Sequence, residues 1–342
     1  MSLLKKLDLD KRLIFVIVIV CLSGLFCGWL IFGKSPELGS DPLPIVTIAT
    51  PTQISAGAFY VAQQQNIFTK HRLDVSIQPF LLGKQALQSV LQDKADLAIL
   101  ADAPFMFAVM NGEKIAALTT IFGSRRTMAI VARKDRGITT AEDLNGKTVG
   151  TIFGTNAQFF IDTLLLTRAI PKSSVTIVDI KPEVLVETLV RGEVDAVTVW
   201  HPDLARLQQL MQDKIVTLYD EDIFVYRFIL VGKQDYIDQH PAEVRQVLLA
   251  ISEATQFIHE QPSQAKAILG QNLKMDPMLL HKAFDANDFY LTLDQTLLLA
   301  LSDETRWAMK QGLVQGPIPN YLDYIRQEPL ESVLPNAIKI IR

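Results

Sequence analysis

Two stretches of the chain repeat one order of hydrophobic and polar positions. Residues 87–104 run from an amphipathic helix through Asp96 and an apolar segment into a loop, and residues 185–203 do the same through Asp195. Short apolar runs bounded by turn residues are typical of buried strands. The repeat predicts two similar lobes, in which each aspartate begins a strand and the end of that strand borders a shared cleft.

The rest of the chain alternates strands with helices, apart from residues 242–311, which are predicted to be mostly helical. Such alternation is typical of an α/β fold with parallel-rich sheets covered by helices. We expect a first lobe from residues 45–133 together with 227–342, and a second lobe from residues 134–226. Strands are predicted at residues 45–49, 73–79, 96–100, 115–122, 127–133, 147–152, 175–180, 195–199, 215–218 and 226–231.

The N-terminus differs from the rest in composition. Residues 13–32 are uncharged and, at about 20 residues, long enough to cross a bilayer as a helix. Four Lys and Arg residues precede this run, which predicts a cytoplasmic segment at residues 1–12. No Ala-x-Ala site follows, so we expect an uncleaved transmembrane anchor, with a removed signal segment as the alternative. Residues 33–44 are predicted to be a linker. The chain is then a single-pass inner-membrane protein whose C-terminal part faces the periplasm or extracytoplasmic space.

Composition excludes several kinds of chemistry from residues 45–342. This part contains no cysteine, because Cys21 and Cys27 both lie in the apolar run, so disulfides and thiolate nucleophiles are excluded. The five histidines have no metal-ligand spacing, and no Gly-x-Ser-x-Gly motif is present. We therefore expect no metal, no cofactor and no catalytic residue. With 28 Lys and Arg against 33 Asp and Glu, the net charge of −5 argues against a nucleic-acid partner.

Two loops between a strand and a helix are candidates for ligand contact, because ligands of open α/β sheets bind beyond the carboxyl ends of strands. The loop of the first lobe holds Gln53, Ser55 and Ala56, and the loop of the second lobe holds Thr155 and Asn156. Free N–H groups at the start of each helix favour an anion or a polar oxygen. Ordinary turns with side-chain caps would use the same residues, so both interpretations stay open.

The ends of the two repeated strands add five more candidates. Ala101, Asp102 and Ala103 end the first strand, and Trp200 and His201 end the second. The Trp200 ring offers a flat apolar wall or a face that attracts cations, and the His201 imidazole could donate to an oxyanion. The alternative for these side chains is a structural role in the core.

Four segments, in order along the chain, together carry a resemblance to a known family. They are residues 59–68 (Phe-Tyr-Val-Ala with Ile-Phe), 95–104 (Ala-Asp-Leu-Ala-Ile-x-x-Asp-Ala-Pro), 142–155 (Glu-Asp-Leu-Asn-Gly-Lys-Thr-Val-Gly with Gly-Thr) and 192–202 (Gly-Glu-Val-Asp-Ala-Val-x-Val-Trp-x-Pro). With these segments, the chain from residue 45 onward resembles a type II periplasmic solute-binding protein of the nitrate, sulfonate, taurine and pyrimidine-precursor group, which serves ABC importers. The resemblance implies two lobes joined by a two-segment hinge that close on a small ligand held by the loops named above. The family often carries Asp where this chain has His201, so the imidazole favours an anionic or neutral ligand.

The resemblance also implies a function and partners. A sulfonate, nitrate, taurine or heterocyclic precursor would be captured by lobe closure and delivered to an ABC permease and its ATPase, with a monomeric ectodomain tethered through residues 13–32. One alternative is a sensing ectodomain that signals through a partner protein. The other is a pyrimidine-precursor synthase of the same superfamily. Such enzymes use a cysteine-rich motif that residues 45–342 lack, so we expect no enzymatic activity.

Overall fold

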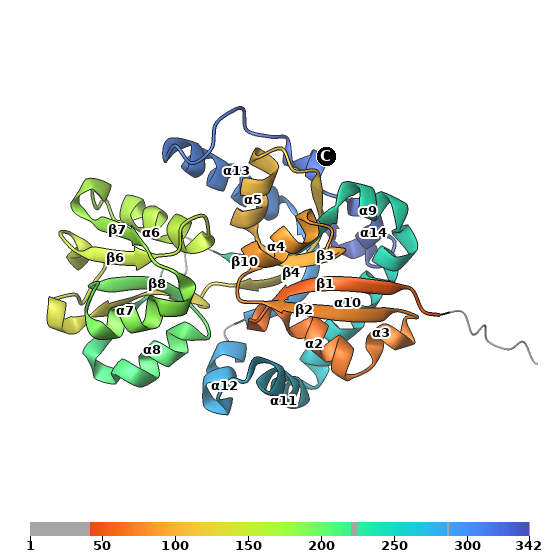
Figure 1. Ribbon diagram of the computed structural model, residues 1–342, viewed down its shortest axis with the longest axis horizontal. Coiled ribbons are helices and arrows are strands. Elements are labelled where there is room, and N and C mark those ends of the chain that lie inside the picture. The colour runs from red at the N-terminus through yellow and green to blue at the C-terminus, as the bar shows by residue number, and fades with distance from the viewer. Residues whose placement is uncertain (1–41, 220–224, 286, 342) are drawn as a thin grey trace, which may run out of the picture. The chain divides into compact units, whose positions relative to one another are not determined.

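The fold consists of two lobes, each built around one β-sheet. The computed structural model describes residues 42–219, 225–285 and 287–341. The part from Pro44 to Arg342 forms one compact unit. Figure 1 shows the seven-stranded sheet of the first lobe next to the five-stranded sheet of the second lobe. The two-lobed α/β architecture predicted from the repeat is therefore confirmed.

The sheet of the first lobe mixes parallel and antiparallel pairs. β1 pairs in parallel with β2 and β3, whereas β10, on which the chain returns from the second lobe, runs antiparallel to β3 and β4. The order across this sheet is β12 (Ile338–Lys339), β11 (Asn287–Asp294), β4 (Ile115–Ser124), β10 (Tyr226–Lys233), β3 (Leu97–Ala101), β1 (Ile45–Pro51) and β2 (Asp74–Phe80).

The sheet of the second lobe repeats this plan on a smaller scale. β6 pairs in parallel with β7 and β8, and β5 runs antiparallel to β8 and β9. The order across it is β7 (Thr176–Asp179), β6 (Thr148–Thr151), β8 (Ala196–Trp200), β5 (Met128–Arg133) and β9 (Ile215–Leu218).

β5 places the lobe boundary earlier than the hydrophobic pattern predicts. We expected residues up to 133 to belong to the first lobe, but the backbone of β5 pairs with β8 and β9 of the second sheet. The first five residues of β5 are buried, and an apolar run of this kind would suit either sheet, so hydropathy alone does not assign it. The lobes are joined by residues 125–127 and by residues 219–225, of which 220–224 lie outside the described part of the chain.

The two repeated aspartates have the structural role that the repeat predicts. Asp96 Oδ2 accepts a hydrogen bond from the Thr47 backbone N–H at 2.7 Å, and Asp195 Oδ2 accepts one from the Thr148 backbone N–H at 2.9 Å. Each carboxylate joins the start of a buried strand to the neighbouring strand that pairs with it in parallel. Hydrogen bonds to charged groups contribute about 1.5–3 kcal/mol each. The repeat in sequence is therefore a repeat in strand pairing.

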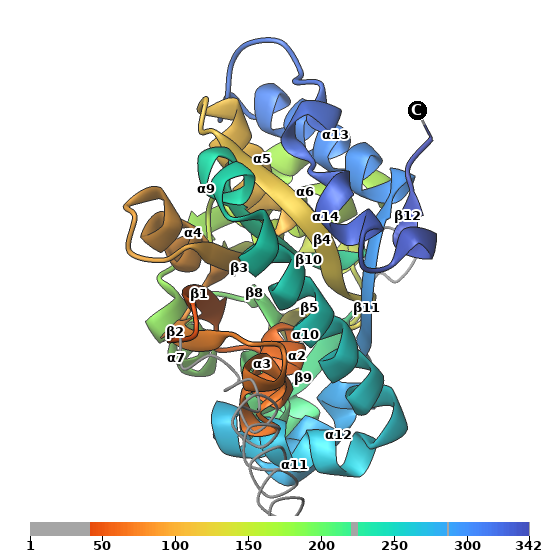
Figure 2. The same cartoon turned by 90° about the vertical axis from the view of Figure 1, so that its right-hand side faces the viewer.

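Helices pack against both sheets. In the first lobe α4 contacts β3 and β1, and α2 contacts α10 and α11, a group that Figure 2 shows together with α3 and α12. The helices of the first lobe are α2 (Gly57–Gln64), α3 (Ile67–Lys70), α4 (Gly83–Leu91), α5 (Asp102–Met110), α9 (Gln234–Gln239), α10 (Pro241–Glu260), α11 (Pro262–Leu273), α12 (Pro277–Asp285), α13 (Gln295–Lys310) and α14 (Gln327–Glu331). Those of the second lobe are α6 (Asn156–Thr167), α7 (Leu185–Arg191) and α8 (Asp203–Met211).

One strand interrupts the region that was predicted to be mostly helical. β11 inserts between β4 and β12 and pairs antiparallel with β4. Its apolar residues Phe289, Leu291 and Leu293 recur at every second position, which is the period of a strand. The strand has only eight residues and lies between two helical stretches, so its alternating pattern does not stand out in the sequence.

The predicted membrane anchor at residues 13–32 lies outside the described residues. Within the described part of the chain, no helix is both long and apolar enough to cross a membrane.

Candidate functional site

Strand ends and helix starts from both lobes meet at a small cavity. β1 leads into the 3-10 turn η1 (Ile54–Ala56), and β2, β3, β6 and β8 lead into α4, α5, α6 and α8. The cavity has a volume of about 20 Å³, which is room for roughly one water molecule. The space between the two lobes is therefore narrow here. Its lining includes the polar residues Gln53, Lys84, Thr155 and Asn156 and the aromatic residues Trp200, Tyr226 and Phe228.

Three aromatic rings form one wall of the cavity. Trp200, from the end of β8, stacks on Tyr226, from the start of β10, with ring centroids 6.3 Å apart and an interplanar angle of 18°. Tyr226 in turn meets Phe228 edge to face at 5.1 Å. The Trp200–Tyr226 stack joins β8 of the second lobe to β10 of the first, so its rings also report how close the lobes are.

Lys84 is a cation at the edge of the cavity. It lies in the first turn of α4, and its Nζ is 3.2 Å from the position that a Cβ on Gly154 of the second lobe would occupy. Its ammonium makes no hydrogen bond or ion pair with any residue that the structure describes, and neither does the amide of Gln53, whose residue is 5% exposed. The cavity therefore has one positive charge and one amide available for a ligand.

The Thr155 side chain caps the start of helix α6, which is the capping role that the sequence allows beside ligand contact. Thr155 Oγ1 accepts a hydrogen bond from the Ala157 backbone N–H at 3.2 Å and donates one to the Ile152 carbonyl at 2.6 Å. Because the Thr155 hydroxyl already donates its proton to the Ile152 carbonyl, it has no proton left to donate to a ligand. A ligand at this loop would meet the exposed side of the cap and the start of the helix.

A buried cluster of polar side chains lies behind the cavity. Asn156 Nδ2 donates to Asp102 Oδ1 at 2.5 Å and to Glu304 Oε1 at 3.2 Å. Asp102 and Glu304 are both 0% exposed. Arg227 Nη1 is 3.8 Å from Asp102 Oδ2. The cluster thus joins α5, α13 and β10 of the first lobe to the first residue of α6 in the second.

The two carboxyl groups of this cluster do not titrate like exposed acids. Burial, followed by the neighbouring Asp102 carboxylate, raises the pKa of Glu304 well above its ordinary value. Burial also raises the pKa of Asp102, but the Arg227 guanidinium acts against that shift. The interaction between the two carboxyl groups acts on them in opposite directions, because it raises the pKa of Glu304 and lowers that of Asp102. We assign the proton to Glu304, which leaves a single negative charge that faces Arg227.

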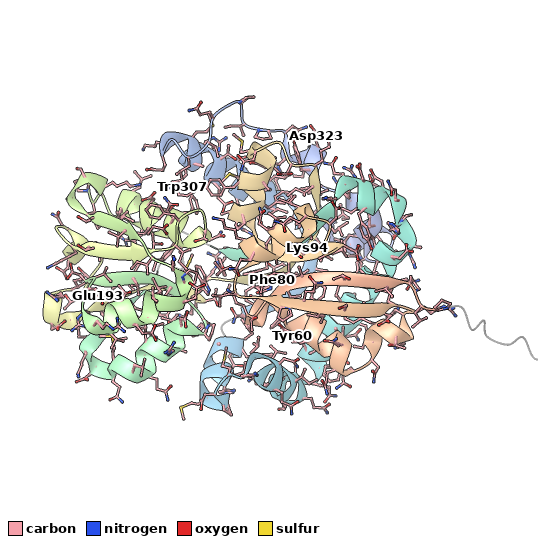
Figure 3. All side chains as sticks on the ribbon, in the orientation of Figure 1. Tyr60, Phe80, Lys94, Glu193, Trp307 and Asp323 are labelled. Carbon is pink, nitrogen blue, oxygen red and sulfur yellow. The ribbon has the colours of Figure 1, made fainter. Side chains whose placement is uncertain are left out.

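A second contact joins the lobes beside this cluster. Trp307 of α13 donates its Nε1 hydrogen to Asp162 Oδ2 of α6 at 2.8 Å, and its ring meets Phe159 of α6 at a centroid distance of 5.3 Å. Figure 3 labels Trp307 where α13 faces the second lobe. The α6–α13 contact therefore closes the lobes at the side where Asn156 meets the acids.

The family model described as NMT1/THI5 like matches residues 53–265, which contain most of both lobes and the cavity. The chain belongs to the NMT1/THI5-like family. The taurine-binding periplasmic protein of Escherichia coli is 23% identical over 210 residues, which are 58% of this chain and 62% of that protein. A Bacillus subtilis protein named as an aliphatic sulfonates-binding protein is 22% identical over 256 residues, 73% of this chain and 75% of that one.

Solved structures of low sequence identity share the fold of this NMT1/THI5-like chain. The alkanesulfonate-binding protein SsuA from Xanthomonas axonopodis pv. citri, bound to MOPS, has a TM-score of 0.71 at 16% identity and covers 89% of this chain and 100% of its own. The desulfurization enzyme DSZB has a TM-score of 0.65 at 15% identity, covering 86% and 99%. Both binding proteins and an enzyme use this fold, so the likeness confirms the two-lobed architecture and leaves the function to the site.

The structure brings half of the sequence-predicted site residues to the cavity of this family member. Their role in ligand contact stays a prediction. Those that line the cavity are Gln53, Ala101, Thr155, Asn156 and Trp200. The five that do not line it, all of them buried, are Ser55, Ala56, Asp102, Ala103 and His201.

His201 is a neutral residue behind the cavity wall. It is 7% exposed, its Nδ1 has no hydrogen-bond partner among the described residues, and burial lowers the pKa of its imidazole to about 4. At neutral pH it therefore carries no positive charge and cannot attract an anion as a cation would. Because His201 does not line the cavity either, its expected influence on the choice of ligand stays a prediction.

The depressed pKa of His201 predicts a loss of stability in acid. The unfolded chain binds a proton below an ordinary histidine pKa of about 6.5, whereas the folded chain binds it only near pH 4. This contribution to the free energy of unfolding is full above pH 6.5 and decreases as the pH falls towards 4. Urea unfolding across this range should show the slope in the wild type and in His281→Gln, whose side chain is 66% exposed, but a smaller slope in His201→Gln. Equal slopes in all three proteins would contradict the assignment.

Sequence reasoning missed two charged residues of the site. Lys84 lies at the start of the helix that follows β2, so the rule that selected residues 53–56 would also have selected residues 81–84. Glu304 lies in the apolar stripe of α13 together with Leu297, Leu301 and Ala308, at positions i, i+4, i+7 and i+11. An acid on the buried stripe of a helix is a signal for a buried polar contact.

Proposed function

We propose that this NMT1/THI5-like chain is an extracytoplasmic solute-binding protein that captures a small anion between its lobes and delivers it to an ABC permease and its ATPase. The observation that carries the proposal is the cavity where five strands of two lobes end. A ligand there would be held by both lobes at once. Family membership and the names of the relatives support the same role.

The charges around the cavity favour an anionic ligand. The Lys84 ammonium has no partner within the described residues, and the Gln53 amide has a free N–H group. The nearby acids do not oppose an anion, because Glu304 is assigned as protonated and Asp102 faces Arg227. The apolar wall of Trp200 suits a short carbon chain. A sulfonate with a small alkyl group combines these two requirements, and two relatives are named for taurine and aliphatic sulfonates.

Capture requires the lobes to separate and close again. A cavity of about 20 Å³ is too small for an organic anion. Opening about the two connections at residues 125–127 and 219–225 would expose the strand ends, and closure would remove water from the ligand. Selectivity would then depend on hydrogen bonds made in a dry site rather than on bond-making chemistry.

The location and partners are part of the same proposal. Residues 13–32 would anchor the chain in the inner membrane, and the two lobes would face the periplasm as a monomer. Tethering would keep the binding lobes near the permease and raise their local concentration there.

Replacing Lys84 tests the ligand class. In the full chain in detergent, Lys84→Gln is expected to weaken binding of ethanesulfonate by about tenfold or more, since a hydrogen bond to a charged group contributes about 1.5–3 kcal/mol. Isothermal titration calorimetry measures this affinity. The matched control is Lys94→Gln, because Lys94 lies in the turn after α4 and its ammonium bonds only Gln92 among the described residues (Figure 3).

Two outcomes would count against the proposal. If ethanesulfonate, taurine and nitrate all fail to bind the wild-type chain, the ligand class is wrong. If ethanesulfonate binds equally well to the wild type and Lys84→Gln, the anion does not lie at this cavity.

A further inference from the structure

One cluster of titratable groups is built from both lobes. Asp102 begins α5 and Glu304 lies in the middle of α13, both in the first lobe, whereas Asn156 begins α6 in the second. The Asn156 amide donates to one oxygen of each acid, at 2.5 and 3.2 Å, and these three residues are at most 1% exposed. Asn156 also lines the cavity. The second lobe thus places a neutral donor on a pair of acids that water does not reach.

The charged groups around this pair stabilise the ionised form of Asp102, so Glu304 is the acid expected to gain or lose a proton. Arg227 of β10 faces Asp102, with Nη1 and Oδ2 3.8 Å apart. Asp303, next to Glu304 on α13, is exposed and bonds Arg306. Three tyrosines complete the surroundings, and burial raises the pKa of each, so all remain neutral at physiological pH. They are Tyr226 of β10, Tyr290 of β11 and Tyr321 of the 3-10 turn at Tyr321–Tyr324.

We propose that Asp102 and Glu304 position Asn156 at the ligand cavity only while they share a proton, so that closure of the lobes takes up one proton from solution. The inference rests on the proposed function, in which the lobes open and close. In the open form Asn156 leaves and water reaches the acids. Glu304 then releases its proton to solvent, and two carboxylates repel each other beside one arginine. In the closed form the proton returns to the Glu304 carboxylate.

The sign of the pH dependence follows from this exchange. Because the closed form holds the proton more tightly, closure is favoured below the ordinary pKa of a glutamic acid, about 4.3, and becomes less favourable as the pH rises through the pKa of Glu304 in the closed form. Ligand affinity follows closure. One proton taken up changes the dissociation constant by up to about tenfold per pH unit within that window.

Closure without ligand can be followed by tryptophan emission in the full chain in detergent. Trp200 stacks on Tyr226, and Trp307 meets Phe159 edge to face, each across the two lobes, so both tryptophan rings become more exposed to water when the lobes open. Trp29, the third tryptophan of the chain, is replaced by Phe. From about pH 5 to 9, the emission is expected to shift to longer wavelength as the pH rises, with one midpoint.

Three variants decide whether Glu304 causes the shift. Glu304→Gln imitates the protonated acid and should remove the transition, leaving the emission of the closed form throughout. Asp102→Asn should move the midpoint to lower pH, because the Asp102 carboxylate raises the pKa of Glu304. Glu331→Gln, an exposed change of the same kind on α14, should titrate like the wild type. A wild type without a transition, or an unchanged transition in Glu304→Gln, would overturn the proposal.

Calorimetry with ethanesulfonate separates this inference from the proposed function. In two buffers of different ionisation enthalpy, the wild type is expected to take up as much as one proton per ligand, and Glu304→Gln none. If ethanesulfonate does not bind but the emission titrates as expected, the ligand class fails and the proton-dependent contact stands. If ethanesulfonate binds without proton uptake and the emission does not titrate, the contact fails and the binding function stands.

Discussion

Trp200→Ala is expected to weaken ethanesulfonate binding by about a hundredfold, equivalent to about 3 kcal/mol. Trp200 is 8% exposed, lines the cavity and stacks on Tyr226, so its removal opens the apolar wall and loosens the contact between the lobes. Loss of a large aromatic side chain also creates a void that the neighbours fill only in part. Calorimetric titration of the full chain in detergent measures the affinity.

Two controls separate binding from folding. Trp200→Phe keeps a ring on Tyr226 and should lose much less affinity than the alanine variant. Phe153→Ala removes a ring that is 38% exposed on a nearby loop and should bind like the wild type. Circular dichroism should show a folded Trp200→Ala chain. Wild-type affinity in that folded variant would place the ligand elsewhere.

Gly83→Ala is expected to lower the free energy of unfolding by about 3 kcal/mol and to reduce ligand affinity as well. A Cβ at residue 83 would lie 2.8 Å from Leu100 Cα and 2.9 Å from Leu100 Cβ, and both atoms belong to the buried strand β3. Backbone in the middle of a sheet cannot move away, so the start of α4 must shift instead. That shift would take Lys84 away from the cavity.

The control for this change is another helical glycine with more room. A Cβ on Gly270 of α11 would come no closer than 3.3 Å, to the flexible Leu280 Cδ2, so Gly270→Ala should be neutral or stabilising, since alanine favours helix over glycine by about 1 kcal/mol. Urea unfolding measures both variants. A Gly83→Ala chain as stable as the wild type would mean that α4 packs less tightly on β3 than its distances indicate.

The sequence predicted what depends on local periodicity and missed what depends on sheet partners. The repeat around Asp96 and Asp195 identified two lobes because the same helix, strand and loop recur in each. β5 was assigned to the wrong sheet, since burial gives a strand no information about its neighbours. β11 was missed because its alternating pattern covers only eight residues and lies between two long helical stretches.

Single side chains at strand ends were harder to predict than the loops that hold them. Ala101 lines the cavity, whereas the next residue, Asp102, is buried and interacts with Glu304 of α13, some 200 positions further along the chain. A one-residue step at a strand-to-helix junction turns a side chain from the cleft to the core. His201 follows Trp200 in the same way. Long-range partners of this kind leave no spacing in the sequence.

The placement of β10, β11 and β12 sets the order in which the lobes can be completed as the chain emerges. The second sheet uses one continuous run from Met128 to Leu218, so it can form before the C-terminal third exists. β4 lies between β10 and β11, so both of its edges stay unpaired until these two later strands have been synthesised. Unpaired edges of buried strands invite pairing with other chains. In a nascent or exported chain, the early strands of the first lobe are therefore the part most exposed to pairing with other chains. This exposure ends when β11, which finishes at residue 294, is in place.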